Sequence, residues 1–352
     1  MKRTSLLLIP ILLIALLLCS CNADAQDGIF SAIADSAPDA GIKVQAYLGM
    51  DSTDTYHYIL TDTGVYSIND PDFNPIINTD DMRFIQACII DDSIYVHSST
   101  STGEEDHNGS KISKYSIKGI KDSEFTEIPN VKNLLVNGAY YTFGDSKDKQ
   151  TIHFLKESTS STDFFSETET KTINSILESG DYVFVELSDK SYVIFDSKSG
   201  EKKIGLPKDT LNSPSVKGFQ TIDDSSFLIV QSDNKVYSIT CDGLEDTGTK
   251  LSNISGNVVH SFHYKTTTDN RDYVVIKGSS SFDIYEITKN EESKYKLSKV
   301  ENPTAPYVTS SLRTTDISNI VKNNDTSIII ATYTNAIWEI DPTSTDDPVE
   351  IK

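Results

Sequence analysis

The hexapeptide Thr63-Gly64-Val65-Tyr66-Ser67-Ile68 returns almost unchanged as Asn234-Lys235-Val236-Tyr237-Ser238-Ile239. Looser copies of this phrase follow one another along the chain at intervals of 39 to 53 residues. The copies are rich in aromatic and β-branched residues, which suit a strand in the middle of a sheet. The central residues of the seven copies are Tyr66, Tyr115, Phe154, Val193, Tyr237, Tyr285 and Trp338.

Other short apolar runs stand around each copy of the phrase. A run such as residues 84–90, closed by Asp91-Asp92, precedes a copy, and a shorter run such as residues 202–205 follows one. Turn-forming residues separate the runs, as they do between antiparallel strands. The order expected in each unit is an inner strand, two middle strands and an outer strand. Four strands in a repeat of about 40 to 50 residues are typical of a β-propeller blade.

The sequence therefore predicts an all-β protein that forms a β-propeller of seven four-stranded blades. Almost no helix is expected, because no stretch keeps an apolar period of 3.6 residues. Packing blades in a ring covers both faces of each blade, which a single blade cannot do alone. A pair of β-sandwiches would explain the strands but not the recurring phrase. Six or eight blades remain alternatives, because the first and third units are the least regular. The expected blades are residues 43–78, 82–129, 131–169, 171–205, 216–251, 257–300 and 317–352.

The N-terminal segment has the features of an export signal. Residues 1–3 carry two positive charges, and the apolar run at residues 6–18 is too short to span a bilayer. The run ends in Leu18-Cys19-Ser20-Cys21, which resembles the lipobox of bacterial lipoproteins. This resemblance implies cleavage before Cys21, a diacylglycerol on its sulfur and an acyl chain on its new amino group. An ordinary secretory signal, cut near Ala23-Asp24-Ala25, is the alternative.

These features give an expected organisation and location. We expect a lipoprotein signal peptide at residues 1–20, a flexible tether at 21–42 and the propeller domain at 43–352. Two or more acyl chains hold a protein stably at a membrane. Asn22, which follows the lipidated cysteine, favours the outer membrane by analogy with enteric sorting. The body would then lie in the periplasm or at the cell surface.

Charge and cysteine content restrict the function further. The chain has a formal charge of −21, and the mature chain would carry 29 basic and 52 acidic residues. Phosphate backbones repel such a chain, so nucleic acid is not an expected partner. Cys88 and Cys241 fall in the second and fifth units. We expect two buried thiols there, because cysteines in separate blades are too far apart to form a disulfide.

The recurring phrase is similar to the Val-Tyr-x-Leu strand of secreted bacterial propellers with quinoprotein-like or YVTN-like repeats. The Trp-containing docking signature of quinoprotein dehydrogenases is absent, and the chain has a single Trp. Quinone chemistry is therefore not expected, and no cofactor is predicted. The resemblance covers one strand in each blade.

Three long connections are expected on one face of the ring, at residues 99–110, 206–215 and 301–316. Long loops on a rigid scaffold are frequent binding sites. We therefore predict that this face binds a protein or glycan partner. The residues predicted to take part are His107, Lys208, Tyr307 and Arg313.

No motif for catalysis or metal binding is recognisable. The G-x-S-x-G, H-E-x-x-H and phosphate-binding glycine patterns are all absent. The acidic loop that ends at His107 has no ligand spacing suited to calcium, and His260 and His263 would point to opposite faces of a strand. The predicted function is a non-enzymatic binding or scaffolding module. The alternatives are a propeller hydrolase or lyase that acts on carbohydrate, and a member of the lipoprotein propeller family of outer-membrane protein assembly, which has eight blades.

Overall fold

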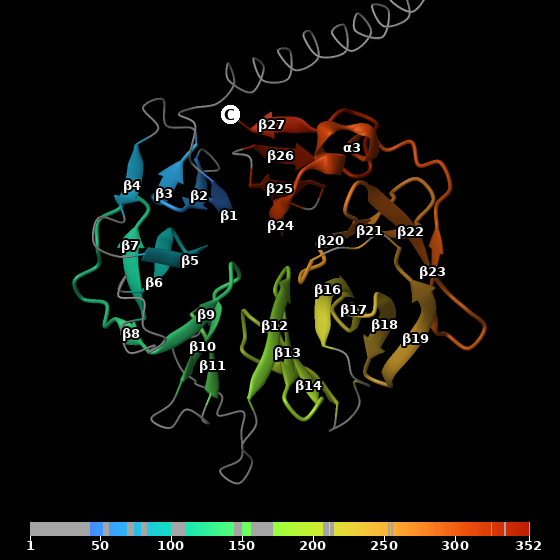
Figure 1. Ribbon diagram of the computed structural model, residues 1–352, viewed down its shortest axis with the longest axis horizontal. Coiled ribbons are helices and arrows are strands. Elements are labelled where there is room, and N and C mark those ends of the chain that lie inside the picture. Colours follow the sequence, from blue (N-terminus) through green and yellow to red (C-terminus); the bar gives the residue numbers. More distant parts are fainter. Residues whose placement is uncertain are drawn as a thin grey trace, which may run out of the picture. The chain divides into compact units, whose positions relative to one another are not determined.

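A computed structural model shows seven antiparallel sheets arranged as the blades of a β-propeller (Figure 1). It describes residues 43–351 except 52–55, 69–73, 79–82, 100–109, 144–149, 156–171, 207–210, 212–214, 253, 255, 325 and 334–335. Consecutive strands pair in each sheet, so the order from the centre outward is the order of the chain. The prediction of an all-β propeller with seven blades is confirmed.

Six of the sheets have four strands, and the described part of the third has three. Blade one contains β1 (Val44–Met50), β2 (His57–Thr61), β3 (Gly64–Ser67) and β4 (Pro75–Asn78). Blade two contains β5 (Arg83–Ile90), β6 (Ser93–Ser99), β7 (Lys111–Ser116) and β8 (Ile128–Pro129). Blade three contains β9 (Val131–Leu134), β10 (Ala139–Phe143) and β11 (Gln150–Phe154). Blade four contains β12 (Ile173–Ser179), β13 (Tyr182–Leu187), β14 (Tyr192–Asp196) and β15 (Lys202–Leu206).

The remaining blades follow the same plan. Blade five contains β16 (Val216–Asp223), β17 (Ser226–Gln231), β18 (Lys235–Thr240) and β19 (Gly243–Lys250). Blade six contains β20 (Ser261–Lys265), β21 (Asp272–Lys277), β22 (Phe282–Lys289) and β23 (Tyr295–Lys299). Blade seven contains β24 (Ile317–Lys322), β25 (Ile328–Thr332), β26 (Ile337–Ile340) and β27 (Val349–Ile351). The helical turns α3 (Pro306–Thr309) and η2 (Ser311–Thr314) lie between blades six and seven.

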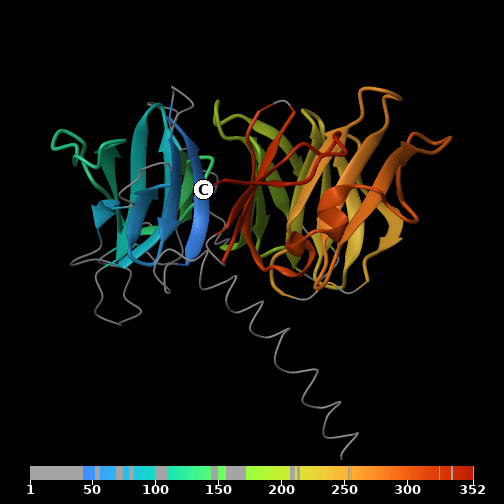
Figure 2. The same ribbon diagram turned by 90° about the horizontal axis from the view of Figure 1, so that it is seen from above.

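The ring has two different ends, which Figure 2 shows at the top and bottom of the side view. One end carries the turns between the first and second and between the third and fourth strands of each blade. We call this end the turn face; residues 180–181 and 224–225 belong to it. The other end, the loop face, carries the links between middle strands and between blades, including residues 188–191 and 300–316.

Apolar and aromatic side chains fill the space between neighbouring blades. Phe184 and Tyr192 of blade four pack with Phe219 and Phe227 of blade five. The rings of Phe219 and Phe227 stack with their centroids 5.6 Å apart. Each large apolar side chain buried in this way contributes about 2 to 3 kcal/mol. The recurring phrase forms the third strand of every blade, where its alternating residues face the two neighbouring blades.

Many acidic residues are used to close turns. The Oδ1 atom of Asp196 accepts hydrogen bonds from the backbone N–H groups of Lys198 at 2.8 Å and Ser199 at 3.2 Å. Aspartate favours such positions because its side chain can satisfy backbone donors that a turn leaves unpaired. Part of the acidity of the chain is thus explained by its many turns. Six other aspartates accept a hydrogen bond from the backbone N–H two residues later in the chain: Asp122, Asp189, Asp223, Asp233, Asp246 and Asp341.

Side chains on the inner strands join one blade to the next. The Ser179 hydroxyl accepts the Thr221 N–H at 2.9 Å, and the Gln86 carbonyl oxygen accepts the Leu134 N–H at 2.8 Å. Asn319 joins the last blade to the first. Its Oδ1 accepts the Tyr47 N–H at 2.9 Å, and its Nδ2 donates to the Tyr47 carbonyl at 3.0 Å.

The prediction of two buried thiols is right for Cys88 and wrong for Cys241. Cys88 lies in β5 and is fully buried, whereas Cys241 is exposed. The reason is that β18 ends at Thr240, so Cys241 opens the turn to the outer strand. Among the described residues, no helix is long and apolar enough to cross a membrane.

Candidate functional site

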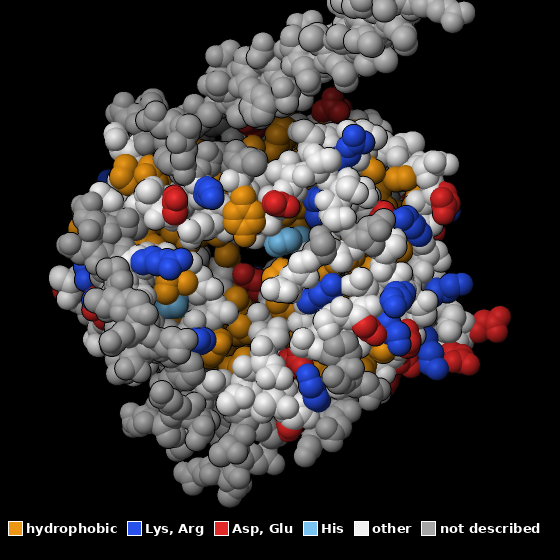
Figure 3. Space-filling view, in the orientation of Figure 1, with side chains coloured by type: hydrophobic (Ala, Val, Ile, Leu, Met, Phe, Trp, Pro, Cys, Tyr) orange, Lys and Arg blue, Asp and Glu red, His pale blue; other side chains and the backbone are white. Residues whose placement is uncertain are grey.

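A cavity of about 640 Å³ lies along the inner strands of blades four to seven. Its walls come from β12, β16, β20 and β24, and it reaches the turn face at Asp181, Asp224 and Thr267. We call it the channel cavity. Figure 3 shows the ring along its axis, with hydrophobic side chains gathered around the central opening. Concave sites of this size with a few polar groups are usual positions for ligands.

Glu178 is the most enclosed carboxylate of the channel cavity. Its Oε1 accepts the Val136 N–H at 3.1 Å, and its Oε2 accepts the Asn137 N–H at 2.9 Å. Removal from water raises the pKa of Glu178, and the two hydrogen bonds oppose that rise. The carboxylate therefore holds the first turn of blade three against blade four.

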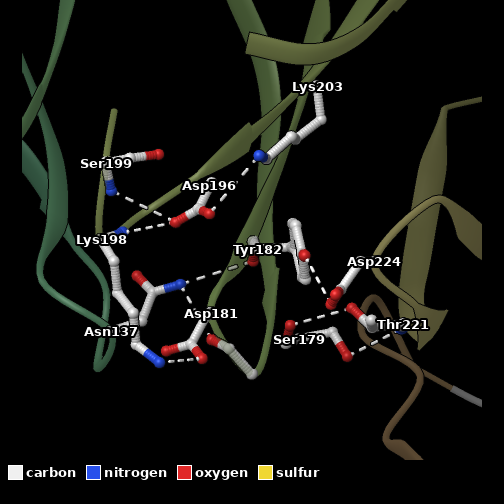
Figure 4. Close-up of polar contacts among 11 residues, drawn as sticks. Asn137, Ser179, Asp181, Tyr182, Asp196, Lys198, Ser199, Lys203, Thr221 and Asp224 are labelled. Carbon is white, nitrogen blue, oxygen red and sulfur yellow. Dashed lines mark hydrogen bonds and ion pairs between the residues drawn. The ribbon is translucent and has the colours of Figure 1, made fainter. Parts of the chain in front are cut away.

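A second group of polar contacts lies where the cavity reaches the turn face (Figure 4). The Tyr182 hydroxyl donates to Asp224 Oδ1 at 2.9 Å, which joins blades four and five. Asp181 forms an exposed ion pair with Lys198, with 2.6 Å between Oδ2 and Nζ. Burial and the neighbouring Asp224 raise the pKa of Tyr182, so its hydroxyl keeps its proton at neutral pH.

The histidines of the cavity are neutral at pH 7. Burial lowers the pKa of His260 to about 4. Burial also lowers the pKa of His263, whose Nε2 lies 3.1 Å from Asp272 Oδ1. A second cavity of about 410 Å³ adjoins the first and shares His263 and Asp223 with it. Around these residues, and elsewhere in the described chain, no cluster of three or more His, Cys, Asp or Glu side chains could hold a metal ion.

The residues predicted from the sequence lie elsewhere. His107 and Lys208 fall outside the described residues. Arg313 is exposed in η2 on the loop face, and its carbonyl accepts Lys277 Nζ at 2.8 Å. Tyr307 is 1% exposed, because α3 turns its ring inward against Phe262 and Phe282. The structure thus places the Tyr307 ring in the core, where it offers no surface to a partner.

Sequence reasoning missed the channel cavity. Its walls come from four blades whose inner strands begin 43 or more residues apart, and no local pattern links them. The residue pairs Glu178-Ser179 and Asp223-Asp224 looked like ordinary strand ends and turns. One signal could have revealed the cavity: polar residues stand at the ends of the inner strands, next to the axis of the ring, where the fold itself requires few polar side chains.

One serine–histidine pair in the described residues has the contacts of a nucleophile and its base. His97 Nε2 lies 3.0 Å from the Ser110 hydroxyl, and His97 Nδ1 lies 3.1 Å from Gln86 Oε1. His97 is 1% exposed and Ser110 is 7% exposed. The Ser110 hydroxyl donates to the Val131 carbonyl of blade three. These groups therefore join blades two and three, and a substrate has no access to them.

Comparisons with known proteins show a likeness in fold. No family model matches the chain, and no curated protein matches it. Kluyveromyces lactis Hsv2p aligns at 13% identity and a TM-score of 0.46, over 70% of this chain and 82% of that one. The N-terminal domain of Nup159 aligns at 15% identity and a TM-score of 0.45, over 87% and 91%. The extracellular domain of the one-component system BT4673 from B. thetaiotaomicron aligns at 12% identity and a TM-score of 0.42, over 90% of this chain and 34% of that one.

Proposed function

We propose that the protein is an exported lipoprotein, anchored through Cys21, whose propeller is a non-enzymatic binding module in the periplasm or at the cell surface. The observation that carries the binding role is the channel cavity, an open hollow of about 640 Å³ on a rigid ring. Its carboxylates accept hydrogen bonds from backbone and tyrosine donors, so they position the walls. We also assign the third-strand phrase to the quinoprotein-like or YVTN-like class of repeats.

The lipid anchor is tested by Cys21→Ala. We expect the wild-type protein in the membrane fraction with a covalent acyl label, and the variant in the soluble fraction without it, because a single motif supplies all the acyl chains. Cys19→Ala is the matched control, since it removes a thiol two residues earlier and leaves the acceptor. Release of both variants, or of neither, would contradict the assignment. Fractionation of outer and inner membranes then tests the outer-membrane location.

Binding at the channel cavity is tested by site-specific photocrosslinking in cells. A photoreactive phenylalanine derivative replaces Thr267, which lines the cavity where it reaches the turn face and is exposed. The same replacement at Arg313 tests the loop face, and at Ile120, 68% exposed on blade two, it serves as the control. We expect a defined crosslinked species from Thr267 alone. A species from Arg313 alone would move the site to the loop face, and equal labelling at all three positions would refute a specific site.

One observation favours a second function, carbohydrate hydrolysis. Glu178 and Asp223 line the same cavity, and the pKa of Glu178 is raised whereas that of Asp223 is lowered. An acid and a base with pKa values moved apart are what glycosidases use. Release of reducing ends from bacterial glycans by the wild type, and not by Glu178→Gln, would support hydrolysis. The seven blades argue against the assembly-factor alternative, whose family has eight.

A further inference from the structure

The walls of the channel cavity carry more negative than positive charge. Asp181, Asp223 and Asp224 face two lysines, Lys265 and Lys322, and both histidines are neutral. Glu178 adds little negative charge, because removal from water raises its pKa. Asp181 is already paired with Lys198. A cation that entered the cavity would therefore meet net negative charge.

Three carboxylates of the cavity accept hydrogen bonds from uncharged donors. Glu178 accepts two backbone N–H groups, Asp224 accepts the Tyr182 hydroxyl, and Asp223 accepts the backbone and hydroxyl of Ser225. In the described chain, no lysine or arginine nitrogen lies within 4.0 Å of their oxygens. Asp223 and Asp224 are exposed, and Lys289 and Lys203 interact with them electrostatically without forming an ion pair. Such hydrogen bonds fix a carboxylate in place without neutralising it, so its charge remains available to a cationic group.

The cavity also offers apolar surface beside these charges. Ile222, next to Asp223, and Tyr264 line it at the turn-face ends of β16 and β20. Beyond the cavity, the negative charge continues over the turn face on exposed side chains such as Asp242 and Glu291. A small cation would use only the cavity, whereas a chain segment with basic and apolar residues would use the whole surface.

We propose that the channel cavity receives a basic, partly apolar segment of a partner protein, with one lysine or arginine side chain entering beside Asp223 and Asp224. This inference rests on the proposed binding function and specifies its partner. The negative turn face attracts the segment, the carboxylates select its cationic side chain, and the apolar wall holds the neighbouring residues.

The probes are three fluorescent heptapeptides that differ only in charge: acetyl-GKLKLKG-amide, acetyl-GQLQLQG-amide and acetyl-GELELEG-amide. Binding to the intact propeller is followed by fluorescence anisotropy at low and high salt. We expect the lysine peptide to bind about tenfold more tightly than the glutamine peptide at low salt, and the difference to shrink at high salt. Equal binding of all three peptides, or binding of none, overturns the inference.

Variants then locate the site. Asp223→Asn with Asp224→Asn keeps an acceptor oxygen for Ser225 and Tyr182 and removes two charges. The matched control, Asp62→Asn with Glu301→Gln, removes two exposed charges from the loop face. We expect the first pair to weaken lysine-peptide binding about tenfold and the control less than about twofold. Equal loss in both pairs would mean attraction by overall charge, which overturns the inference.

The outcomes separate this inference from the proposed function. A partner crosslinked at Thr267 whose bound segment is neutral or acidic would sustain the binding function and refute the basic segment. Absence of any Thr267 crosslink, together with selective lysine-peptide binding at Asp223 and Asp224, would sustain the chemical preference of the cavity and refute its use as the site of a stable partner in the cell.

Discussion

Replacement of Asn319 by alanine is expected to lower the free energy of unfolding by about 3 kcal/mol, because it removes both hydrogen bonds between the Asn319 amide and the Tyr47 backbone. Tyr47 is 1% exposed, so water does not easily replace the lost amide. No strand pairs across this seam, since each described blade is built from consecutive strands. The Asn319 amide is therefore a main polar link between blades that lie at the two ends of the propeller sequence.

The matched control is Asn323→Ala, in the same blade. Asn323 donates to Ser327 and Glu339, so its contacts stay within blade seven. We expect urea unfolding to show a larger loss for Asn319→Ala, and hydrogen exchange to rise in β1 and β24 before other inner strands. Equal losses in the two variants, with uniform exchange around the ring, would show that packing alone closes the seam.

The blade plan was predictable because it depends on local sequence. A third strand between two blades must present apolar side chains on both sides, and this requirement returns every time the chain completes a blade. A copy of the phrase, such as Val65-Tyr66 or Val236-Tyr237, therefore occurs in every sheet, including sheets whose outer strand is short. The number of blades follows from counting the phrase, since each copy occupies one sheet.

Features that depend on where a strand stops were less predictable. The apolar pattern of β18 continues toward Cys241, but the chain turns after Thr240 and exposes the thiol. Tyr307 stands in a long connection that looks like surface loop in the sequence. The helical turn α3 folds its ring between two blades, and only the tertiary structure supplies the aromatic neighbours Phe262 and Phe282.

The candidate site was hidden from the sequence for a different reason. A propeller brings together residues of its inner strands, and β12, β16, β20 and β24 each contribute four to six residues to the cavity. Glu178 and Asp223 are 45 residues apart in the chain and line one cavity. The sequence contains both carboxylates, but it does not show which blades point them into a common space.

The stability of the fold is expected to decrease as the pH falls from 6.5 to 4, in part through His97. Burial lowers the pKa of this side chain from its usual 6.5 to about 4. The unfolded chain therefore takes up a proton below pH 6.5, whereas the folded chain does so only near pH 4. The stabilising effect of the neutral imidazole is complete above pH 6.5 and is lost progressively toward pH 4, by about 3 kcal/mol.

His97→Gln isolates this effect, because an amide can still donate and accept hydrogen bonds but does not titrate. We expect the difference in unfolding free energy between wild type and variant to narrow by about 3 kcal/mol between neutral pH and pH 4. Ser110→Ala is the control, because it removes a partner of His97 but keeps the titrating ring. Its free energy of unfolding should therefore change with pH in the same way as that of the wild type. If His97→Gln also runs parallel to the wild type, the imidazole takes up a proton without loss of stability. The acceptors Gln86 Oε1 and the Val131 carbonyl must then compensate for its burial.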